Sequence, residues 1–386
     1  MFERTRTLFR MARGLSASRR PARSNRTLAL LFEQQAGSSP DHPFLLFEEQ
    51  RFTYGEGNAA VNRHVRAYEG LGVAQGDTIA LMMDNRPEFL WHFLAAGKLG
   101  ATVSLINTHN SGKPLVHALQ ICSPKLIVIG SEHAAAFDDI RGDLGLEAPV
   151  LVDVEGDAGG ATFSDTVFGS LMEGASEDDP ASTSQQNLDQ LGAYIYTSGT
   201  TGLPKAAKMR HARMHGIAMA FGGMGWAIRR DDRIYNPLPL YHTSGLIVCT
   251  SAVIAFGATL VLARRFSARR FWEDVREHDC TGFVYIGELC RYLMNQPPRD
   301  DDADNRIRVV VGNGLRPDIW AEFQQRFGIG KVREFYGSTE GNVGSLNLDG
   351  TVGSVGRLIG RGSALVKGDD EADDFLRGPD GFMVRC

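Results

Sequence analysis

Hydroxyl groups, glycines and one ammonium group are concentrated in residues 194–205 of the sequence. An apolar run that ends at Tyr196 leads into six consecutive Ser, Thr or Gly residues, and Pro204 and Lys205 close the stretch. Glycines let the backbone approach a ligand that a side chain would hold away, and a loop of backbone N–H groups attracts anions. The stretch therefore predicts a strand that ends in a polyphosphate-binding loop. The Gly-Lys-Ser/Thr ending of a Walker A loop is absent, so this is another kind of phosphate loop; a plain linker is the alternative.

Two later strand-like runs also end in loops of small and polar residues. Residues 307–311 lead into a Gly-Asn-Gly turn at 312–314, and residues 332–336 lead into the run Gly-Ser-Thr-Glu-Gly-Asn at 337–342. In parallel sheets, ligands collect beyond the carboxyl ends of the strands. Three such strand ends, counting the loop after Tyr196, predict one shared pocket.

Four side chains in or near these loops carry groups suited to nucleotide chemistry. Thr339 and Glu340 offer hard oxygen ligands of the kind that Mg²⁺ uses beside phosphates, and Tyr336 offers a ring able to stack on a base. A solvated loop carboxylate is the alternative for Glu340. His242 follows two prolines and precedes Gly245 in a rigid turn at the start of an apolar helix. That position predicts either a functional imidazole or a satisfied structural one.

The segment from 27 to about 156 predicts elements that would carry part of this pocket. Helix-like and strand-like runs alternate there, which is typical of a parallel sheet covered by helices on both faces. Pro87 suits the first turn of a helix, and Gly100 suits the position after its end. The predicted helices cover 58–71 and 87–98, and the predicted strands cover 78–83, 101–106, 125–129 and 150–154.

The second half follows residues 155–187, which are rich in Gly, Ser, Asp and Glu and predict a surface connection. Residues 214–228 are rich in Met, Ala and Gly, which favours close helix packing or a slot for an apolar chain. A helix is expected over 318–327, where apolar residues repeat on one side.

One uncharged run of 19 residues, Gly245–Ala263, is long enough to be considered as a membrane-spanning helix. It contains Thr250, Ser251 and Thr259, and Gly257 divides it into a helix-like part and a short β-like part. We therefore expect a buried helix, a glycine cap and a buried strand.

The composition is ordinary for a soluble globular protein with more than one domain, with 386 residues, 43% apolar and 23% charged residues. A net charge of −5 argues against general nucleic-acid binding. Five scattered cysteines without a C-x-x-C pair predict neither a cysteine zinc site nor a disulfide framework, and they favour a reducing, cytoplasmic compartment.

Residues 1–26 contain eight arginines, one glutamate and no long apolar core. They therefore do not predict a secretory signal. A disordered basic leader is expected, and two alternatives stay open: peripheral attachment to anionic lipid at the inner face of a membrane, and organelle import.

Five segments together resemble the adenylate-forming, acyl-CoA synthetase superfamily, and most closely its branch of fatty acid transport proteins and very-long-chain acyl-CoA synthetases. The first and last segments are specific for the superfamily, the third and fourth select the branch, and the resemblance runs from about residue 27 to the end. The segments are Tyr-Ile-Tyr-Thr-Ser-Gly-Thr-Thr-Gly-Leu-Pro-Lys-Ala-Ala at 194–207, Pro-Leu-Tyr-His-Thr-Ser-Gly at 239–245, Tyr-Ile-Gly-Glu-Leu-Cys-Arg-Tyr at 285–292, Val-Gly-Asn-Gly-Leu-Arg-Pro at 311–317 and Glu-Phe-Tyr-Gly-Ser-Thr-Glu-Gly-Asn at 334–342.

The resemblance implies an α/β fold with two mostly parallel sheets flanked by helices, followed by the start of a small β-barrel subdomain. Members of the superfamily use ATP and Mg²⁺ to convert a carboxylate into an acyl-adenylate, and then pass the acyl group to the thiol of coenzyme A. The implied activity here is that of a long- or very-long-chain fatty acid–CoA ligase. A ligase for another carboxylic acid and a non-catalytic component of lipid binding or fatty acid uptake are the alternatives.

The resemblance also implies roles for individual residues. The β- and γ-phosphates would be wrapped by Thr197, Ser198, Gly199, Thr200, Thr201, Gly202 and Lys205. The adenine would be framed by Gly312, Asn313, Gly314 and Tyr336, and the same nucleotide-binding set includes Glu334, Gly337 and Ser338.

The remaining implied roles concern the reacting groups. Thr339 would touch the α-phosphate, and Glu340 would hold Mg²⁺. His242 would sit where the acyl carboxylate enters, ahead of a helix that lines the acyl tunnel, and Lys205 would offset the repulsion between carboxylate and triphosphate.

The chain departs from the family pattern at its end. Only 44 residues follow Asn342, and they contain no match to the family's ribose-binding aspartate, hinge or small C-terminal domain with its catalytic lysine. We therefore interpret the sequence as a truncated synthetase that binds ATP–Mg²⁺ and fatty acid weakly and turns over slowly or not at all. The expected divisions are a leader over 1–26, a first α/β subdomain over 27–156, a surface connection over 157–190, a second α/β subdomain over 191–350 and a partial barrel over 351–386.

Overall fold

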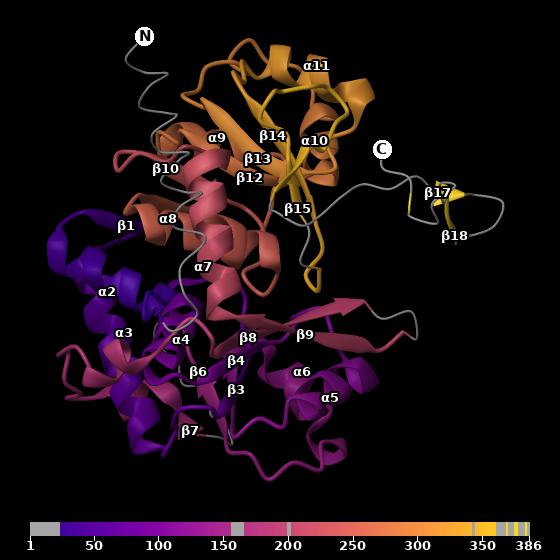
Figure 1. Cartoon of the computed structure of the whole chain (residues 1–386). Helices are drawn as coiled ribbons and strands as arrows, with labels where there is room; N and C mark the ends of the chain where they lie inside the picture. Colours follow the sequence, from indigo (N-terminus) through magenta and orange to yellow (C-terminus); the bar gives the residue numbers. More distant parts are fainter. Residues whose placement is uncertain are drawn as a thin grey trace.

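The structure, a computed structural model, describes residues 24–155, 166–198, 202–341, 344–359, 368–369, 374–376 and 383. Several expectations fall outside these residues: almost all of the basic leader, part of the surface connection, residues 199–201 of the phosphate loop, Asn342 and most of the expected barrel segment. Two sheets organise the described chain, and Figure 1 shows them one above the other with helices α7 (His211–Ala220) and α8 (Ser251–Phe256) in the middle.

The first sheet has seven strands in the order β7-β6-β5-β3-β4-β8-β9. Neighbouring strands are parallel except β8 and β9, which form an antiparallel pair. The strands are β3 (Thr78–Met82), β4 (Thr102–Leu105), β5 (Leu126–Gly130), β6 (Val150–Asp153), β7 (Thr166–Val167), β8 (Leu191–Ser198) and β9 (Pro204–Arg210). The four strands predicted for the first half are all present, and each end lies within one residue of its predicted place.

Alternate residues of this sheet enter two separate cores. Ile79 and Leu81 belong to the large core, whereas Ala80 and Met82 belong to a smaller one. Because successive side chains of a strand point to opposite faces, both faces of the sheet are covered, as the sequence predicts. The helices and helical turns of this half are α3 (Tyr54–Gly70), α4 (Pro87–Leu99), α5 (Gly112–Ile121), α6 (Ala134–Asp138), η1 (Ser131–His133), η2 (Arg141–Asp143), η3 (Phe168–Met172) and η4 (Ala181–Gln185).

Local signals explain where the two long helices of this half begin and end. α3 starts four residues earlier than predicted, because Thr53 and Glu56 form a capping box at its first turn. α4 starts at Pro87 and ends before Gly100, which adopts the left-handed conformation with φ 75°. The predicted helix start and glycine cap of α4 are therefore confirmed.

The second sheet has nine strands in the order β16-β15-β14-β13-β12-β10-β11-β1-β2. Its central strands, from β1 to β14, are parallel, and antiparallel pairs occur at both edges. The strands are β1 (Pro43–Phe47), β2 (Gln50–Thr53), β10 (Arg233–Asn236), β11 (Thr259–Leu262), β12 (Gly282–Ile286), β13 (Val309–Asn313), β14 (Val332–Gly337), β15 (Gly344–Leu346) and β16 (Arg357–Ile359). A separate two-stranded pair joins β17 (Gly368–Asp369) to β18 (Asp374–Phe375).

The helices of the second half cover this sheet and fill the middle of the molecule. Figure 1 shows α9 (Phe271–Glu277), α10 (Gly287–Met294) and α11 (Pro317–Arg326) beside the second sheet. In the middle, α2 (Leu28–Ser38) packs against α4, α7 and α8, so the N-terminal helix contacts both halves. Two π-helical turns, η5 (Phe221–Gly225) and η6 (Thr243–Thr250), extend α7 and precede α8.

The uncharged run Gly245–Ala263 forms a buried helix, a glycine cap and a buried strand, as predicted. It contains most of η6, all of α8 and β11, and Gly257 caps α8 with φ 70°. Among the described residues, the structure contains no helix with the length and apolar character needed to cross a membrane.

The predicted fold class is confirmed, because two mostly parallel sheets flanked by helices account for the described chain. The described part of the C-terminal segment contributes antiparallel edge strands and one short strand pair, and no closed barrel is formed by the described residues. β1 comes from the N-terminal segment but pairs with β11 of the second half, so the two halves share a sheet.

Candidate functional site

Two of the three predicted loops meet at one hydrogen bond between the sheets. Thr197 lies near the end of β8 in the first sheet, and its hydroxyl donates to the Glu340 carboxylate beyond β14 at 2.5 Å. Lys205 lies opposite Thr197 across the β8–β9 ladder. The pKa of Glu340 is lowered, first by the Thr197 hydrogen bond and further by the charges of Arg213 and Lys205. A carboxylate, a hydroxyl and an ammonium group are therefore gathered at the mouth of the phosphate loop.

Part of the predicted phosphate loop cannot be placed. Gly199, Thr200 and Thr201 lie outside the described residues, as does the side chain of Ser198. Gly202 is described and has a φ of 81°, a left-handed conformation that favours glycine.

The loop after β14 is held from two sides. Arg213, on α7, donates to the carbonyl of Ser338 at 2.8 Å and also to the carbonyl of Gly341. Thr339 shares a hydrogen bond of 3.0 Å with the hydroxyl of Thr243, the residue after His242. The loop that carries Thr339 and Glu340 is thus fixed to both α7 and the histidine turn.

Sequence reasoning did not single out Arg213. Its two acceptors are backbone carbonyls 125 and 128 residues away in the chain. A carbonyl acceptor has no residue-type signature, so no sequence signal could have found this contact.

The third predicted loop, 312–314, is built by a buried carboxylate. Glu334, 3% exposed on β14, accepts hydrogen bonds from the Tyr285 hydroxyl at 2.6 Å and from the backbone N–H groups of Gly314 and Leu315, both at 2.9 Å. Burial raises the pKa of Glu334. Both of its oxygens are used within the protein, so its visible role is to shape the Gly-Asn-Gly turn.

The glycines of this turn are required by close backbone contacts. A Cβ on Gly312 would lie 2.3 Å from the carbonyl oxygen of Tyr285, and Gly314 has a φ of 87°. Two side chains at or near the turn are candidates for contact with a ligand. The Asn313 Oδ1 atom is buried and has no hydrogen-bond partner among the described residues, and the Tyr336 side chain is 60% exposed. An unpaired acceptor and an exposed aromatic ring are the kinds of group that could contact a purine with an amino group.

His242 precedes the first turn of η6, as the proline-rich turn predicts. Its side chain is accessible to solvent, but the surrounding protein desolvates it and lowers its pKa, and the charge of His109 lowers the pKa further. The imidazole is therefore neutral near pH 7 and can accept or donate a hydrogen bond.

A cavity of about 480 Å³ opens between the two halves beside Tyr241 and His109. Its wall is mostly apolar and includes Leu238, Phe266, Ile286, Leu289 and Tyr292. Charged side chains occur at the same cavity together with the imidazole of His133; they are Asp84, Arg264, Arg265 and Glu288. The lining comes from six separate chain segments, so no single sequence motif predicts it.

Comparisons with known proteins identify the family to which the sequence belongs. The family described as AMP-binding enzyme matches residues 32–383. The medium/long-chain fatty acid–CoA ligase FadD6 of Mycobacterium tuberculosis is 38% identical over 362 residues, covering 94% of this chain and 59% of that protein. Long-chain fatty acid transport protein 2 of Rattus norvegicus is 38% identical over 378 residues, covering 95% of this chain and 60% of that protein. The chain thus spans about three-fifths of the length of these relatives.

Solved structures show the same fold. The anthranilate CoA ligase AuaEII in complex with anthranoyl-AMP matches with a TM-score of 0.79 at 21% identity, over 94% of this chain and 69% of that one. The inhibitor-bound N-terminal domain of FACL13 from Mycobacterium tuberculosis matches with a TM-score of 0.75 at 25% identity, over 92% of this chain and 86% of that one. Because the family match covers nearly the whole sequence, the chain belongs to the AMP-binding enzyme family.

Proposed function

We propose that this chain is the nucleotide-binding and acyl-activating part of an AMP-forming fatty acid–CoA ligase for long or very long chains. The observation that carries the proposal is the hydrogen bond from Thr197 to Glu340. It joins the predicted phosphate loop after β8 of one sheet to the loop after β14 of the other. The printed names of the curated relatives, a fatty acid–CoA ligase and a fatty acid transport protein, support a fatty acid as the substrate.

ATP is the nucleotide that these groups suit. The unpaired Asn313 Oδ1 would accept a hydrogen bond from the adenine amino group, and Tyr336 would cover a face of the ring. Gly312 and Gly314 let the turn pack closely against the backbone of Tyr285 and Gly287, which fixes the position of Asn313. Glu334 would act through the turn that it holds, because its oxygens are already hydrogen-bonded.

The phosphate end would lie among Thr197, Lys205, Thr339 and Glu340. Glu340 would hold Mg²⁺, which supplies positive charge against the repulsion between a triphosphate and a carboxylate. Lys205 adds a positive charge, and Thr339 offers a hydroxyl to the α-phosphate. Arg213 and Thr243 keep the loop in place before substrate binds, so these groups need little reorganisation during the reaction.

The acyl group would enter beside His242. The turns η5 and η6 and helix α8 next to it are buried and apolar, which suits a hydrocarbon chain. Holding the carboxylate in line with the α-phosphate contributes up to about 7–11 kcal/mol of the barrier. The 480 Å³ cavity beside Tyr241 has apolar walls and the charged groups of Arg264 and Arg265, which suits the slender arm and phosphates of coenzyme A.

The experiment is a test of nucleotide binding and of acid-dependent ATP–pyrophosphate exchange with the purified chain. Glu340→Gln and Asn313→Ala are compared with Glu322→Gln, which alters an exposed carboxylate on α11. We expect the first two variants to weaken ATP–Mg²⁺ binding at least tenfold and the control to bind as the parent does. Equal ATP binding in all three variants would remove the proposal.

A panel of acids then separates the ligase classes. Exchange stimulated only by an aromatic or amino acid would assign a different carboxylate, and tight fatty acid binding without any ATP binding would favour a lipid-uptake component. Peripheral contact with the inner face of a membrane also remains a proposal, supported by the eight arginines among residues 1–26. Co-sedimentation with anionic vesicles tests it.

A further inference from the structure

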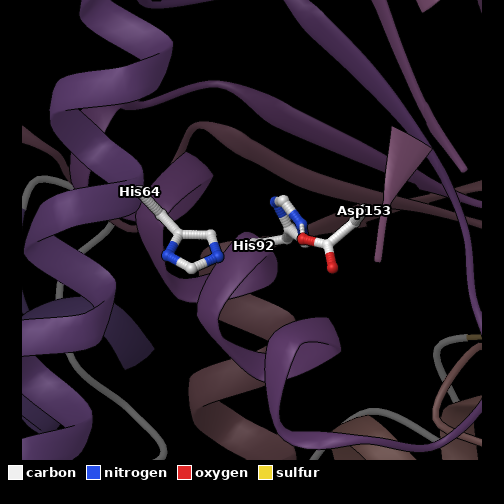
Figure 2. A group of neighbouring side chains, drawn as sticks. All are labelled: His64, His92 and Asp153. Atoms are coloured by element: carbon white, nitrogen blue, oxygen red, sulfur yellow. Dashed lines mark hydrogen bonds and ion pairs between the residues drawn. The ribbon is translucent and has the colours of Figure 1, made fainter. Parts of the chain in front are cut away.

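A compact group of buried polar side chains lies in the first half, outside the proposed substrate sites. His64 on α3, His92 on α4 and Asp153 at the end of β6 point toward one another (Figure 2). Their exposed fractions are 3%, 1% and 3%. One ligand-type atom from each, a ring nitrogen or a carboxylate oxygen, lies within 4.8 Å of the other two.

Each of the three side chains is also held at its other polar atom. The partners are the carbonyl of Ala60 for His64 Nδ1 at 2.8 Å, the hydroxyl of Tyr68 for His92 Nδ1 at 2.7 Å, and the guanidinium of Arg86 for Asp153 Oδ1 at 2.8 Å. Outer hydrogen bonds of this kind fix the tautomer and orientation of metal-binding histidines and carboxylates. The Nε2 atoms of both histidines and Asp153 Oδ2 are the atoms left facing one another.

One of these atoms has no partner. The carbonyl of Ala60 can only accept, so His64 carries its proton on Nδ1 and presents a lone pair at Nε2. That Nε2 atom is buried and has no hydrogen-bond partner among the described residues. Its surroundings are the rings of His92 and Phe168, with centroids at 4.7 and 5.2 Å. A buried lone pair without a donor is unfavourable, and a bound cation would satisfy it.

We propose that His64, His92 and Asp153 form a binding site for a divalent transition-metal ion, zinc by ligand type, that ties α3 and α4 to β6. Two imidazole nitrogens and one carboxylate are a common ligand set for zinc, whereas Mg²⁺ and Ca²⁺ prefer oxygen ligands. Ligand atoms around tetrahedral zinc lie roughly 3.4 Å apart. The ligand atoms lie within 4.8 Å of one another, so the widest pair would close by at most about 1.4 Å, and the 2.8 Å contact between His92 and Asp153 would open slightly.

The local charge suits a cation. Two carboxylates, those of Asp153 and Glu88, face the single guanidinium of Arg86, at 2.8 and 3.8 Å. Cysteine spacing gives no sign of such a site, because the ligands are histidines and an aspartate on three separate elements. The site stabilises the first half and takes no part in the proposed chemistry.

The test uses tag-free protein from zinc-supplemented medium and measures metal content, Co²⁺ absorption and melting with and without zinc. We expect one zinc per chain and a melting temperature a few degrees higher with zinc. His64→Leu removes the unpaired nitrogen, so its melting temperature should not rise when zinc is added. In the presence of chelator, the variant should melt no lower than the parent. His64→Gln keeps a polar side chain of similar length and loses zinc binding as well.

His133→Ala is the matched control, because Asp84, Glu132 and His133 form a second, more exposed group of ligand-type atoms. This variant keeps the zinc content and the zinc-dependent shift of the parent. Zinc below about one tenth of an equivalent in the parent would overturn the proposal. Zinc binding that survives both His64 variants, or that disappears only in His133→Ala, would overturn it too.

Discussion

Single residues decide how the carboxylate loop is presented to a nucleotide. Glu340 is exposed on a short loop, and its position depends on one hydroxyl from β8 and on the guanidinium of Arg213 behind it. Among the described residues, Arg213 donates to the carbonyls of Ser338 and Gly341 on either side of Thr339 and Glu340. It therefore positions these groups and has no direct contact with a ligand in the proposed arrangement.

Arg213→Gln is therefore expected to weaken ATP binding at saturating Mg²⁺ about tenfold, which corresponds to about 1.4 kcal/mol. Glutamine is shorter and neutral, so it cannot bridge both carbonyls of the loop. Titration calorimetry measures the effect, and Arg213→Lys should recover part of it. Arg269 is an exposed arginine remote in sequence from the loop, and Arg269→Gln should bind like the parent. Normal binding by Arg213→Gln would mean that the loop holds its shape without this anchor.

His211 gives a pH-dependent contribution to stability. It is 4% exposed, neither ring nitrogen has a partner among the described residues, and burial lowers its pKa to about 4. The unfolded chain binds a proton here near pH 6.5, whereas the folded chain does so only near pH 4. Stability at this site is therefore full above about pH 6.5 and falls with pH toward 4, by about 1.4 kcal/mol per unit.

His211→Leu should remove that slope. Urea unfolding at several pH values between 4 and 7 measures it, with His117→Leu, a partly exposed histidine on α5, as the control. We expect the His211 variant to be at least as stable as the parent at pH 5. An unchanged slope between pH 6.5 and 4 would show that His211 is protonated or hydrogen-bonded in the folded protein.

At the scale of elements, one buried lysine joins three helices to the connecting segment. The Lys98 ammonium on α4 donates to Glu33 on α2, to Asn58 and Asn62 on α3, and to Asp179 in the connection, at 2.8 to 3.1 Å. The lysine is fully buried, while the side chains of Glu33 and Asp179 are 18% and 50% exposed. The connection is therefore anchored to the helices by charge as well as by packing.

Lys98→Met should lower the free energy of unfolding by about 3 kcal/mol. This value is at the low end for breaking a buried ion pair, because both carboxylates remain partly exposed to solvent. Denaturant unfolding measures the loss, and limited proteolysis should cut earlier near Asp179. Lys113→Met, on the exposed surface of α5, should change stability by less than about 0.5 kcal/mol. A similar small change for Lys98→Met would mean that the helices hold the connection without it.

The sequence predicted these elements well where the signal was local. The caps at Gly100 and Gly257 and the strands of the first half depend on residues within a few positions of each other, and all are confirmed. α3 starts four residues earlier than the sequence predicts, because a capping box of Thr53 and Glu56 forms its first turn. The pairing of β1 with β11 was also missed, because it depends on residues more than 200 positions apart.

In the candidate site, too, the local motifs were predictable and the contacts between distant segments were not. Motif residues at the strand ends were predictable, and the structure brings Thr197, Lys205 and Glu340 together. Arg213, the cavity lining and the His64 cluster were not predictable, because each depends on contacts between distant segments whose acceptors or walls carry no residue-type signature.

At the scale of the whole molecule, the site depends on how the two halves are joined. Asn85, which follows β3 of the first half, is 5% exposed. Its amide donates to the carbonyls of Leu238 and Ala263 at 3.0 and 2.9 Å, and its carbonyl accepts from the backbone N–H of Leu240 at 2.8 Å. Leu238 and Leu240 belong to the proline-rich turn that carries His242, so one side chain of the first half positions the proposed acyl side of the site in the second.

Asn85→Ala should therefore affect both stability and substrate binding. Three hydrogen bonds are lost and three buried backbone groups are left without partners, which should lower the free energy of unfolding by about 2–3 kcal/mol. Released from the first half, the turn with His242 should move, so fatty acid binding should weaken more than ATP binding. Denaturant unfolding and separate titrations with the two ligands measure these effects.

Asn295 is an exposed asparagine at the end of α10, and Asn295→Ala is the control for the loss of an amide group. This variant should leave stability, ATP binding and fatty acid binding unchanged. The decisive comparison is between the ligands. A purely structural role for Asn85 would weaken both ligands equally at a temperature where the variant is still folded. A larger loss for the fatty acid would instead mean that the contact between the halves sets the geometry of the proposed acyl site. The proposed ATP loops meet the proline-rich turn at Thr243, but they are also fixed by Thr197 and Arg213, so they should move less than His242.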